Sequence, residues 1–265
     1  MWRFLLLFPL FVFGAYIGNP ADPALMNTGF FSSHYPFFKF TTGYVGDYVS
    51  DKRYEAQQTS PNFNPNQAFR HFGLHSQLAS VSMIIVERLE IFGMAGGSKE
   101  HAQWNPQPTI TDAATTFFDF ESNYQFSWST GAKVIFLQWG PVFLSGNFTY
   151  FAVPSSHKTY FKFFNRLNLP LDTAPEQRFG LSEWQTSLAL SVRIVFVTPY
   201  AGIDYLHSHL AVQGGPQVPA INYYNDPKFG YFYGLTLSLT GRFHVNIERR
   251  VRNEFAYGFS TIAVF

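Results

Sequence analysis

Three ionisable side chains stand close together in the segment TPYAGIDYLHSHL: Asp204, His207 and His209. Imidazoles at alternate positions share one face of an extended strand, so the two histidines could bind a metal ion or form part of a hydrolytic dyad. Such a site needs a third partner at a defined position, and the sequence supplies none. We therefore interpret these residues as polar rim residues at the mouth of the interior that the strands enclose, and we expect no catalytic residue, metal site, cofactor or enzyme activity.

Arginine is concentrated near the C-terminus, where it forms the densest charge of the chain. The cluster consists of Arg242, Arg249, Arg250 and Arg252. Guanidinium groups bind phosphate through paired hydrogen bonds, so the cluster could contact a phosphate-bearing partner, or it could favour anions at the mouth of a channel. A solvated loop explains the same residues equally well, and both interpretations stay open.

The elements that would position these groups are indicated by the segment SEWQTSLALSVR, residues 182–193, in which apolar and polar side chains alternate. One parity carries Trp184, Thr186, Leu188, Leu190 and Val192. Because successive side chains of a strand point to opposite faces, the segment has one apolar wall and one polar wall. A soluble β-sandwich would bury the apolar wall, whereas a membrane barrel would turn it outward to lipid.

The composition favours the membrane barrel. Charged residues make up 13% and aromatic residues 20% of the chain, including 32 Phe and 15 Tyr. Soluble domains carry about 25% charged residues. No run of about 20 apolar residues follows the N-terminal region, so helical spans are not expected there. Short turns alternate with long polar loops, and aromatic residues gather at strand ends, as the interfacial girdles of a barrel require.

Ten segments show strand-like alternation. They cover residues 37–49, 71–84, 89–95, 124–136, 142–150, 182–193, 198–210, 231–239, 243–250 and 255–265, with a polar loop expected over 96–109. An even number of strands is typical of bacterial barrels. The sequence therefore predicts an all-β fold, an antiparallel transmembrane β-barrel of ten strands. A count of twelve, with a further pair inside residues 154–178, stays open.

Five charged residues fall on the polar parity of these strands. They are Lys39, Asp47, Lys133, Glu183 and Arg193. A Lys or Arg facing lipid would cost about 2–4 kcal/mol at mid-bilayer, so these side chains are expected to face the lumen. We predict them as pore-lining candidates. Rings of cationic side chains favour anions, so Lys133 and Arg193 would bias the ions that pass.

The beginning of the chain reads as a secretory signal. Arg3 supplies a positive charge before the apolar residues 4–13, and Val12 and Gly14 fit the small-residue cleavage rule, so the mature chain is expected to start at Ala15. We assign residues 1–14 to the signal peptide and residues 15–265 to the barrel. The chain has no Cys, which excludes disulfide cross-linking. It has no nucleotide-binding fingerprint and no basic excess, so no nucleic-acid partner is expected.

Several segments resemble the chlamydial major outer membrane porin family. AYIGNPADPALM is similar to the family's mature N-terminus, and GYVGDYVSDKR is similar to its first strand. MIIVERLEIFGMAGGS, FSWSTGAKVIFLQWGPVFLSGNFTYF and SEWQTSLALSVRIVFVTPYAGIDY follow in the family's order, and NIERR precedes a terminal strand that ends in Phe265. The loops do not match. The chain also departs from the family in being shorter and in lacking every Cys.

The resemblance implies a porin of the cell outer membrane that lets small solutes and ions diffuse and contributes to envelope structure, with a homotrimer as one alternative for its assembly. Outer-membrane lipid and lipopolysaccharide are the implied partners, and the arginine cluster supplies candidate contacts at the rim. A ten-stranded barrel can be filled by its own side chains, since wide channels belong to barrels of 16 strands or more. A non-conducting structural or adhesive surface barrel is therefore the alternative function.

Overall fold

The structure is a computed structural model, and it describes residues 16–25, 37–56, 69–104, 117–154, 159–164, 170–171, 178–213, 221–240 and 242–265. The predicted signal peptide and its cleavage site lie outside these residues. A single short helix, α1 (Asp22–Leu25), is present in the described part of an otherwise all-β chain. No helix within the described ranges has the length and apolar character needed to cross a bilayer.

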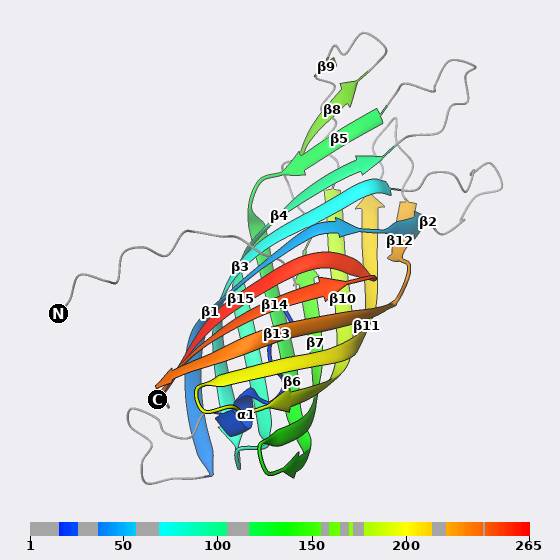
Figure 1. The fold of residues 1–265 in the computed structure, drawn as a ribbon. Helices are drawn as coiled ribbons and strands as arrows, with labels where there is room; N and C mark the ends of the chain where they lie inside the picture. The colour runs from blue at the N-terminus through cyan, green and yellow to red at the C-terminus, as the bar shows by residue number, and fades with distance from the viewer. Residues whose placement is uncertain are drawn as a thin grey trace.

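Ten strands pair antiparallel into a closed barrel (Figure 1). They are β1 (Phe38–Lys52), β3 (Phe69–Ile85), β4 (Leu89–Trp104), β6 (Gln125–Trp139), β7 (Val142–Val153), β10 (Arg178–Val192), β11 (Val197–Gln213), β13 (Phe229–Thr240), β14 (Phe243–Val251) and β15 (Glu254–Val264). The circuit closes because β1 pairs with β15 on one side and with β3 on the other, while β3 also pairs with β4. The prediction of ten strands is confirmed.

The two ends of the barrel differ. The end of the barrel near the C-terminus, which we call the turn end, carries short connections between strands (Figure 1). The opposite end, which we call the loop end, carries the short strands that are not part of the closed barrel. At the turn end, Gly140 and Pro141 alone connect β6 to β7, and Gly140 has φ of 56°. Pro141 fixes the second position of the turn at φ near −65°. The positive φ of the turn therefore falls on residue 140, and only glycine accepts a positive φ without strain.

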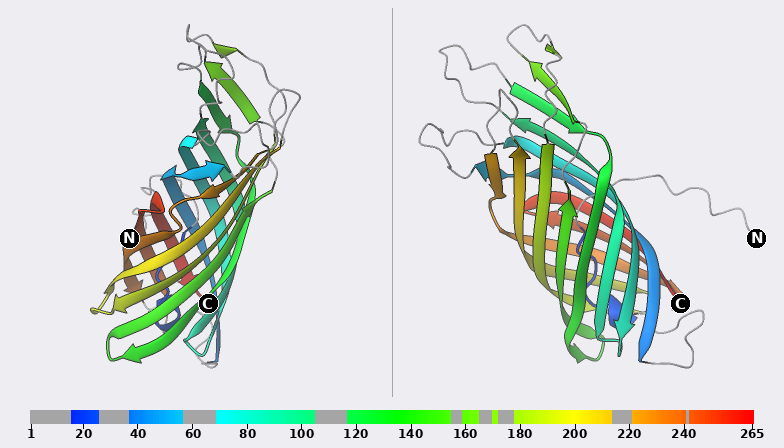
Figure 2. Two further views of the ribbon diagram at one scale, coloured as in Figure 1. Left: turned by 90° about the vertical axis from the view of Figure 1, so that its right-hand side faces the viewer. Right: turned by 180° about the vertical axis from the view of Figure 1, so that it is seen from behind.

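The short strands build an arm at the loop end (Figures 1 and 2). Its members β5 (Phe117–Ser122), β8 (Thr159–Phe164) and β9 (Pro170–Leu171) continue the sheet outward from β4, and β8 pairs with β5 rather than with a strand of the closed wall. Strand β12 (Ile221–Asn225) pairs with β11 and with β2 (Tyr54–Ala56). The two strands found within residues 154–178, β8 and β9, therefore belong to the arm and not to the closed wall, and the twelve-stranded alternative is wrong.

Strand β4 is longer than the sequence indicated. The predicted loop over residues 96–109 begins as strand, because β4 stays paired with β3 as far as Trp104. The Gly96-Gly97 pair resembles a turn signal, but here glycine permits close approach of two strands. A Cβ on Gly96 would collide with the backbone carbonyl oxygen of Gln77. The position needs glycine for lack of space rather than for a turn.

The barrel is apolar outside and polar inside. Leu188 is 42% exposed on the outer face, whereas its neighbour Ser187 is 8% exposed and faces inward. An outer belt of exposed apolar side chains includes Val81, Ile91, Leu188, Leu190, Ile203 and Ile247. Exposed aromatic rings flank this belt, with Trp128, Trp184, Tyr231 and Tyr257 toward the loop end and Phe38, Trp139, Phe196 and Phe265 toward the turn end. The orientation predicted for residues 182–193 is confirmed, and this polarity is that of an outer-membrane barrel.

Candidate functional site

The lumen is the candidate functional site, because a solute that crosses a barrel passes through its lumen. An apolar core fills the loop end of the lumen. Tyr54 from β2 and Tyr223 from β12 pack there with inward-facing residues of β3, β7, β10 and β11, and both rings are 1% exposed. The other members of this core include Phe72, Leu74, Phe151, Val153, Phe179, Leu181, Leu210 and Val212. The short strands β2 and β12, which are separate from the arm, thus contribute side chains that close the lumen toward the outside.

Residues 16–25, which we call the luminal segment, occupy the turn-end half of the lumen (Figures 1 and 2). Among the described residues, its backbone-to-backbone hydrogen bonds are local, from Asp22 to Asn19 and from Ala24 to Ala21. It is therefore not an additional strand of the wall. It is held by its own side chains and by polar groups that the wall turns inward.

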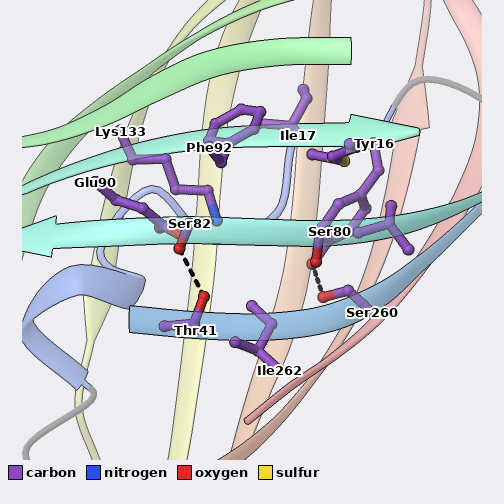
Figure 3. A pocket seen from close by; sticks show the side chains of 12 residues that line it. Tyr16, Ile17, Thr41, Ser80, Ser82, Glu90, Phe92, Lys133, Ser260 and Ile262 are labelled. Carbon is purple, nitrogen blue, oxygen red and sulfur yellow. Dashed lines mark hydrogen bonds and ion pairs between the residues drawn. The ribbon is translucent and has the colours of Figure 1, made fainter. Parts of the chain in front are cut away.

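The first half of the luminal segment is anchored by hydrogen bonds from several strands. The Ile17 amide donates to Glu248 Oε1 at 3.3 Å, and Ser260 Oγ donates to the Tyr16 hydroxyl at 2.9 Å (Figure 3). Asn19 Nδ2 donates to Thr236 Oγ1 at 2.9 Å, while its Oδ1 accepts from Ser191 Oγ at 2.8 Å. These partners come from β10, β13, β14 and β15, so the segment ties together strands on different sides of the lumen.

The second half of the segment is anchored by an ion pair. Lys133 Nζ on β6 lies 2.8 Å from Asp22 Oδ2 and 3.7 Å from Glu90 Oε2 on β4. Asn246 Nδ2 donates to the same Asp22 oxygen at 3.2 Å. Burial raises the pKa of the Asp22 carboxyl, and the neighbouring charge of Lys133 opposes that rise. A cavity of about 20 Å³ remains between Tyr16, Glu90 and Lys133, which is room for about one water molecule (Figure 3).

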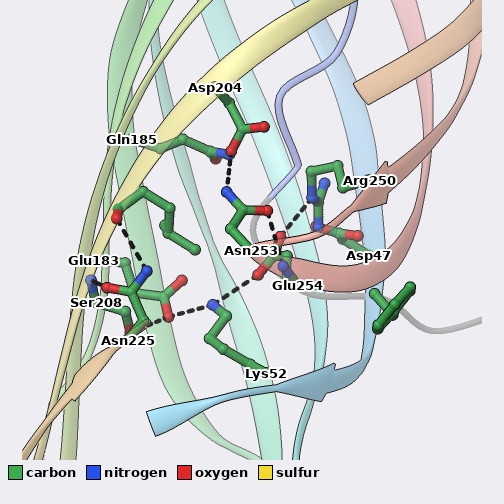
Figure 4. Close-up of polar contacts among 12 residues, drawn as sticks. Asp47, Lys52, Glu183, Gln185, Asp204, Ser208, Asn225, Arg250, Asn253 and Glu254 are labelled. Atoms are coloured by element: carbon green, nitrogen blue, oxygen red, sulfur yellow. Dashed lines mark hydrogen bonds and ion pairs between the residues drawn. The ribbon is translucent and has the colours of Figure 1, made fainter. Parts of the chain in front are cut away.

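A second ionic network crosses the middle of the lumen (Figure 4). Arg250 on β14 pairs with Asp47 of β1, with Glu248 at 3.0 Å and with Glu254 at 2.6 Å. Lys52 Nζ continues the network, at 2.8 Å from Glu254 and 2.6 Å from Glu183 of β10. The Arg250 and Lys52 side chains are completely buried. Opposite charges thus bridge the barrel from wall to wall.

The described part of the lumen carries more carboxylates than cations. The buried acidic residues are Asp22, Asp47, Glu90, Glu100, Glu183, Asp204, Glu248 and Glu254, and the buried basic residues are Lys39, Lys52, Lys133 and Arg250. An acidic excess attracts cations rather than anions. Lys133 has acidic groups around it, and Arg193 donates to a backbone carbonyl oxygen. The expectation that these two residues bias the passing ions toward anions stays a prediction, and the acidic excess opposes it.

The structure places the five pore-lining candidates as follows. Lys39, Asp47, Lys133 and Glu183 all face the lumen and are at most 5% exposed. Lys39 lies at the turn end, where its Nζ is 2.6 Å from Glu87. Arg193 is half-buried in the connection between β10 and β11, and its guanidinium donates to the carbonyl oxygen of Ala24 in the luminal segment. These residues fill the lumen with ion pairs, and whether they line a conducting path stays a prediction.

The predicted arginine cluster is divided in space. Arg242 lies at the turn end, whereas Arg249 and Arg252 are exposed near the loop end. Their guanidinium carbons lie 5.2 Å from the Tyr257 ring centroid and 5.7 Å from that of Tyr231. Arg250 is buried in the lumen, so its prediction as a rim contact is wrong. The alternation already contained this signal, because Ile247 on the outer parity puts Arg250 on the inner one.

Asp204 and the two histidines beside it do not form a site. Asp204 faces the lumen, where it accepts hydrogen bonds from Gln185 Nε2 at 3.0 Å and from Asn253 Nδ2 (Figure 4). His207 and His209 lie on the outer face of β11, each against the ring of Tyr224. The shared face of the histidines is confirmed, but they line the outside and not the mouth of the lumen. Within the described ranges, no group of three His, Cys, Asp or Glu residues could hold a metal ion.

Comparison with known proteins gives structural similarity without sequence similarity. No family model matches the chain, and no curated protein matches it. The outer membrane protease OmpT from Escherichia coli is similar at a TM-score of 0.44 with 8% identity, over 87% of this chain and 95% of that one. The outer membrane protein OprG from Pseudomonas aeruginosa is similar at 0.38 with 6% identity, over 86% and 96%. At these scores the similarity assigns neither an activity nor a ligand to this chain.

Proposed function

We propose that the protein is a structural barrel of the outer membrane that is closed to diffusion and holds the arm of short strands at the cell surface. The observation that carries the proposal is that described side chains occupy the lumen at three levels. An apolar core occupies the loop end, the Arg250 network the middle, and the luminal segment the turn end. Each of these would have to move before a hydrated ion could pass.

Recording from planar bilayers tests the proposal. Full-length protein is refolded, shown to resist unfolding in detergent, and inserted into the bilayer. We expect it to produce no conductance steps in 1 M KCl. A ten-stranded barrel whose lumen has been emptied would serve as the positive control for insertion and detection. Regular, long-lived conductance steps from the wild-type chain would contradict the closed barrel and establish a channel.

Porin-type diffusion is the alternative function that the same experiment decides. Its support is the resemblance of the strand segments to the chlamydial major outer membrane porin family, which we offer as a proposal of common descent. If the chain conducts, the acidic excess of the lumen leads us to expect a preference for cations. A reversal potential measured across a KCl gradient would show that preference directly.

The remaining assignments of partners follow the same proposal. Exposed Arg249 and Arg252 lie beside aromatic rings near the loop end, where lipopolysaccharide phosphates would stand in the outer leaflet. A trimer stays an alternative for the assembly, to be tested by cross-linking in native membranes. The absence of enzyme activity also stays a prediction, which a screen of peptidase and lipase substrates can test.

A further inference from the structure

Two neighbouring turns at the turn end expose apolar side chains, and we call them together the turn anchor. They are residues 139–141 between β6 and β7 and residues 194–196 between β10 and β11. Trp139 in the first turn and Val195 in the second are each 87% exposed. The turns are adjacent because β7 pairs with β10, and the Pro141 carbonyl oxygen accepts a hydrogen bond from the Arg193 amide at 2.8 Å.

The turn anchor carries no charged side chain, in contrast to the turns on either side of it. The turn between β3 and β4 contains Glu87 and Arg88, and Arg242 lies directly before β14. Arg193 directly precedes residues 194–196, but its guanidinium is turned inward and donates to the carbonyl oxygen of the luminal segment. The rim of the turn end therefore has an apolar sector between two charged ones.

The turn anchor continues the apolar belt of the barrel without a polar break. Alternate residues of β10 form one outward row, in which Leu188, Leu190 and Val192 are 42%, 57% and 36% exposed. Ile194 in the turn continues this row and is 57% exposed. A lipid-facing row usually ends in polar residues where it leaves the bilayer. This row reaches the tip of the turn while it is still apolar.

The backbone around the second tip is hydrogen-bonded within the sheet. Ile194 and Val197 exchange two backbone hydrogen bonds, at 2.7 and 2.9 Å. The Phe196 carbonyl oxygen accepts from the Ser238 amide of β13 at 2.8 Å. Backbone groups without partners are costly among lipids, where no water replaces the missing bond. The bonding on both sides of this tip therefore suits a location in the bilayer.

We propose that the turn anchor is embedded among the lipids of the periplasmic leaflet, while the charged turns on its flanks project into water. Lipid is the occupant to which the observations point, because the anchor is continuous with the lipid-facing belt and offers no charge to a polar partner. The anchor thus holds one side of the rim in the bilayer. The proposal rests on the membrane location of the barrel and not on whether its lumen is closed.

Fluorescent labels on single cysteines test the proposal. The chain has no Cys, so each label stands only at the chosen position. Full-length W139C and V195C are labelled in the anchor, and E87C and R242C are the matched controls in the flanking turns. All four are reconstituted in phosphatidylcholine vesicles, with iodide on both sides of the bilayer as the aqueous quencher or phosphatidylcholine brominated on its acyl chains as the lipid quencher.

We expect the two quenchers to give opposite orders. Brominated lipid should quench the W139C and V195C labels more strongly than the E87C and R242C labels, and iodide should quench the control labels more strongly. The anchor labels should also emit at shorter wavelength than the controls. L188C, in the middle of the apolar belt, serves as the positive control for insertion, because brominated lipid should quench its label strongly.

Folding equilibria in vesicles give an independent measure without a label. Val195 and Val86 hold the same position in two hydrogen-bonded turns and have φ of 54° and 52°. Threonine keeps the branched shape of valine and adds a hydroxyl. V195T should lower the equilibrium constant for folding into vesicles about tenfold, because the hydroxyl enters an apolar environment. V86T should change the constant by no more than about twofold, as at a solvated surface.

Three results would overturn the proposal. Iodide quenching of the V195C label as strong as that of the E87C label would place the turn in the periplasm. Protection of the V195C label from both quenchers would show that protein, here a second copy of the chain, covers the turn in place of lipid. Equal effects of V195T and V86T would show that the two turns have the same surroundings. Absence of lipid quenching at the L188C label would instead remove the membrane location, and the proposal with it.

Discussion

At the scale of single residues, Arg250 shows how the lumen tolerates so much charge. Its guanidinium contacts the carboxylates of Asp47, Glu248 and Glu254, and none of these side chains is more than 1% exposed. A planar group with five N–H donors can serve three acceptors at once, which a lysine ammonium cannot do with the same geometry. Removal of this one cation would leave three buried carboxylates to repel one another.

We therefore expect Arg250→Met to lower the free energy of unfolding by about 3–5 kcal/mol, the usual loss when one member of a buried ion pair is removed. Arg249→Met is the matched control, because Arg249 is exposed and only lies over the Tyr257 ring. That contact is worth about 0.5–1 kcal/mol. Urea titration of both variants in detergent micelles measures the difference. Losses of equal size would show that the network does not stabilise the fold.

At the scale of elements, the connection between β6 and β7 is set by two residues. Gly140 takes the positive φ, and nothing lies within 4 Å of the place where its Cβ would be. Gly140→Ala should therefore cost about 1–2 kcal/mol from backbone strain alone. Gly180 in β10 is equally uncrowded but has no positive φ. Gly180→Ala should be neutral or stabilising by up to about 1 kcal/mol. Equal effects in equilibrium unfolding would contradict the turn assignment.

The strands were the part of the fold that could be predicted from the sequence. Alternation in residues 182–193 gave the strand, its phase and its outer face, since a strand between lipid and a polar lumen must alternate. The luminal segment gave no such signal, because its partners are inward side chains from six strands and it has no periodicity of its own. The ionic network was missed for a similar reason. Lys52 and Glu183 are 131 residues apart and meet only across the closed barrel.

At the scale of the whole molecule, the barrel reverses the usual polarity of a protein, with its charges inside and its apolar belt outside. Leu188→Arg should therefore impair folding into bilayers more than Ser187→Arg, by about 2–4 kcal/mol, although the residues are adjacent. Ser187 is the cross-strand neighbour of Asp204 in the lumen, so an arginine there gains a carboxylate partner. The fraction of each variant that folds into lipid vesicles, measured over a series of urea concentrations, compares the two. The reverse order would refute the assigned orientation.

The luminal segment also constrains the order in which the molecule can be assembled. Tyr16 meets Ser260 and Ile17 meets Glu248, contacts that span 244 and 231 residues of the chain. The first described residues are thus seated by the last strands, and the wall closes only where β1 pairs with β15. Contacts this distant in sequence form late, because loop closure costs entropy before they contribute. Seating of the segment is therefore complete only with the barrel, because a chain interrupted before β15 would lack both the Ser260 anchor of Tyr16 and the strand that closes the wall around the segment.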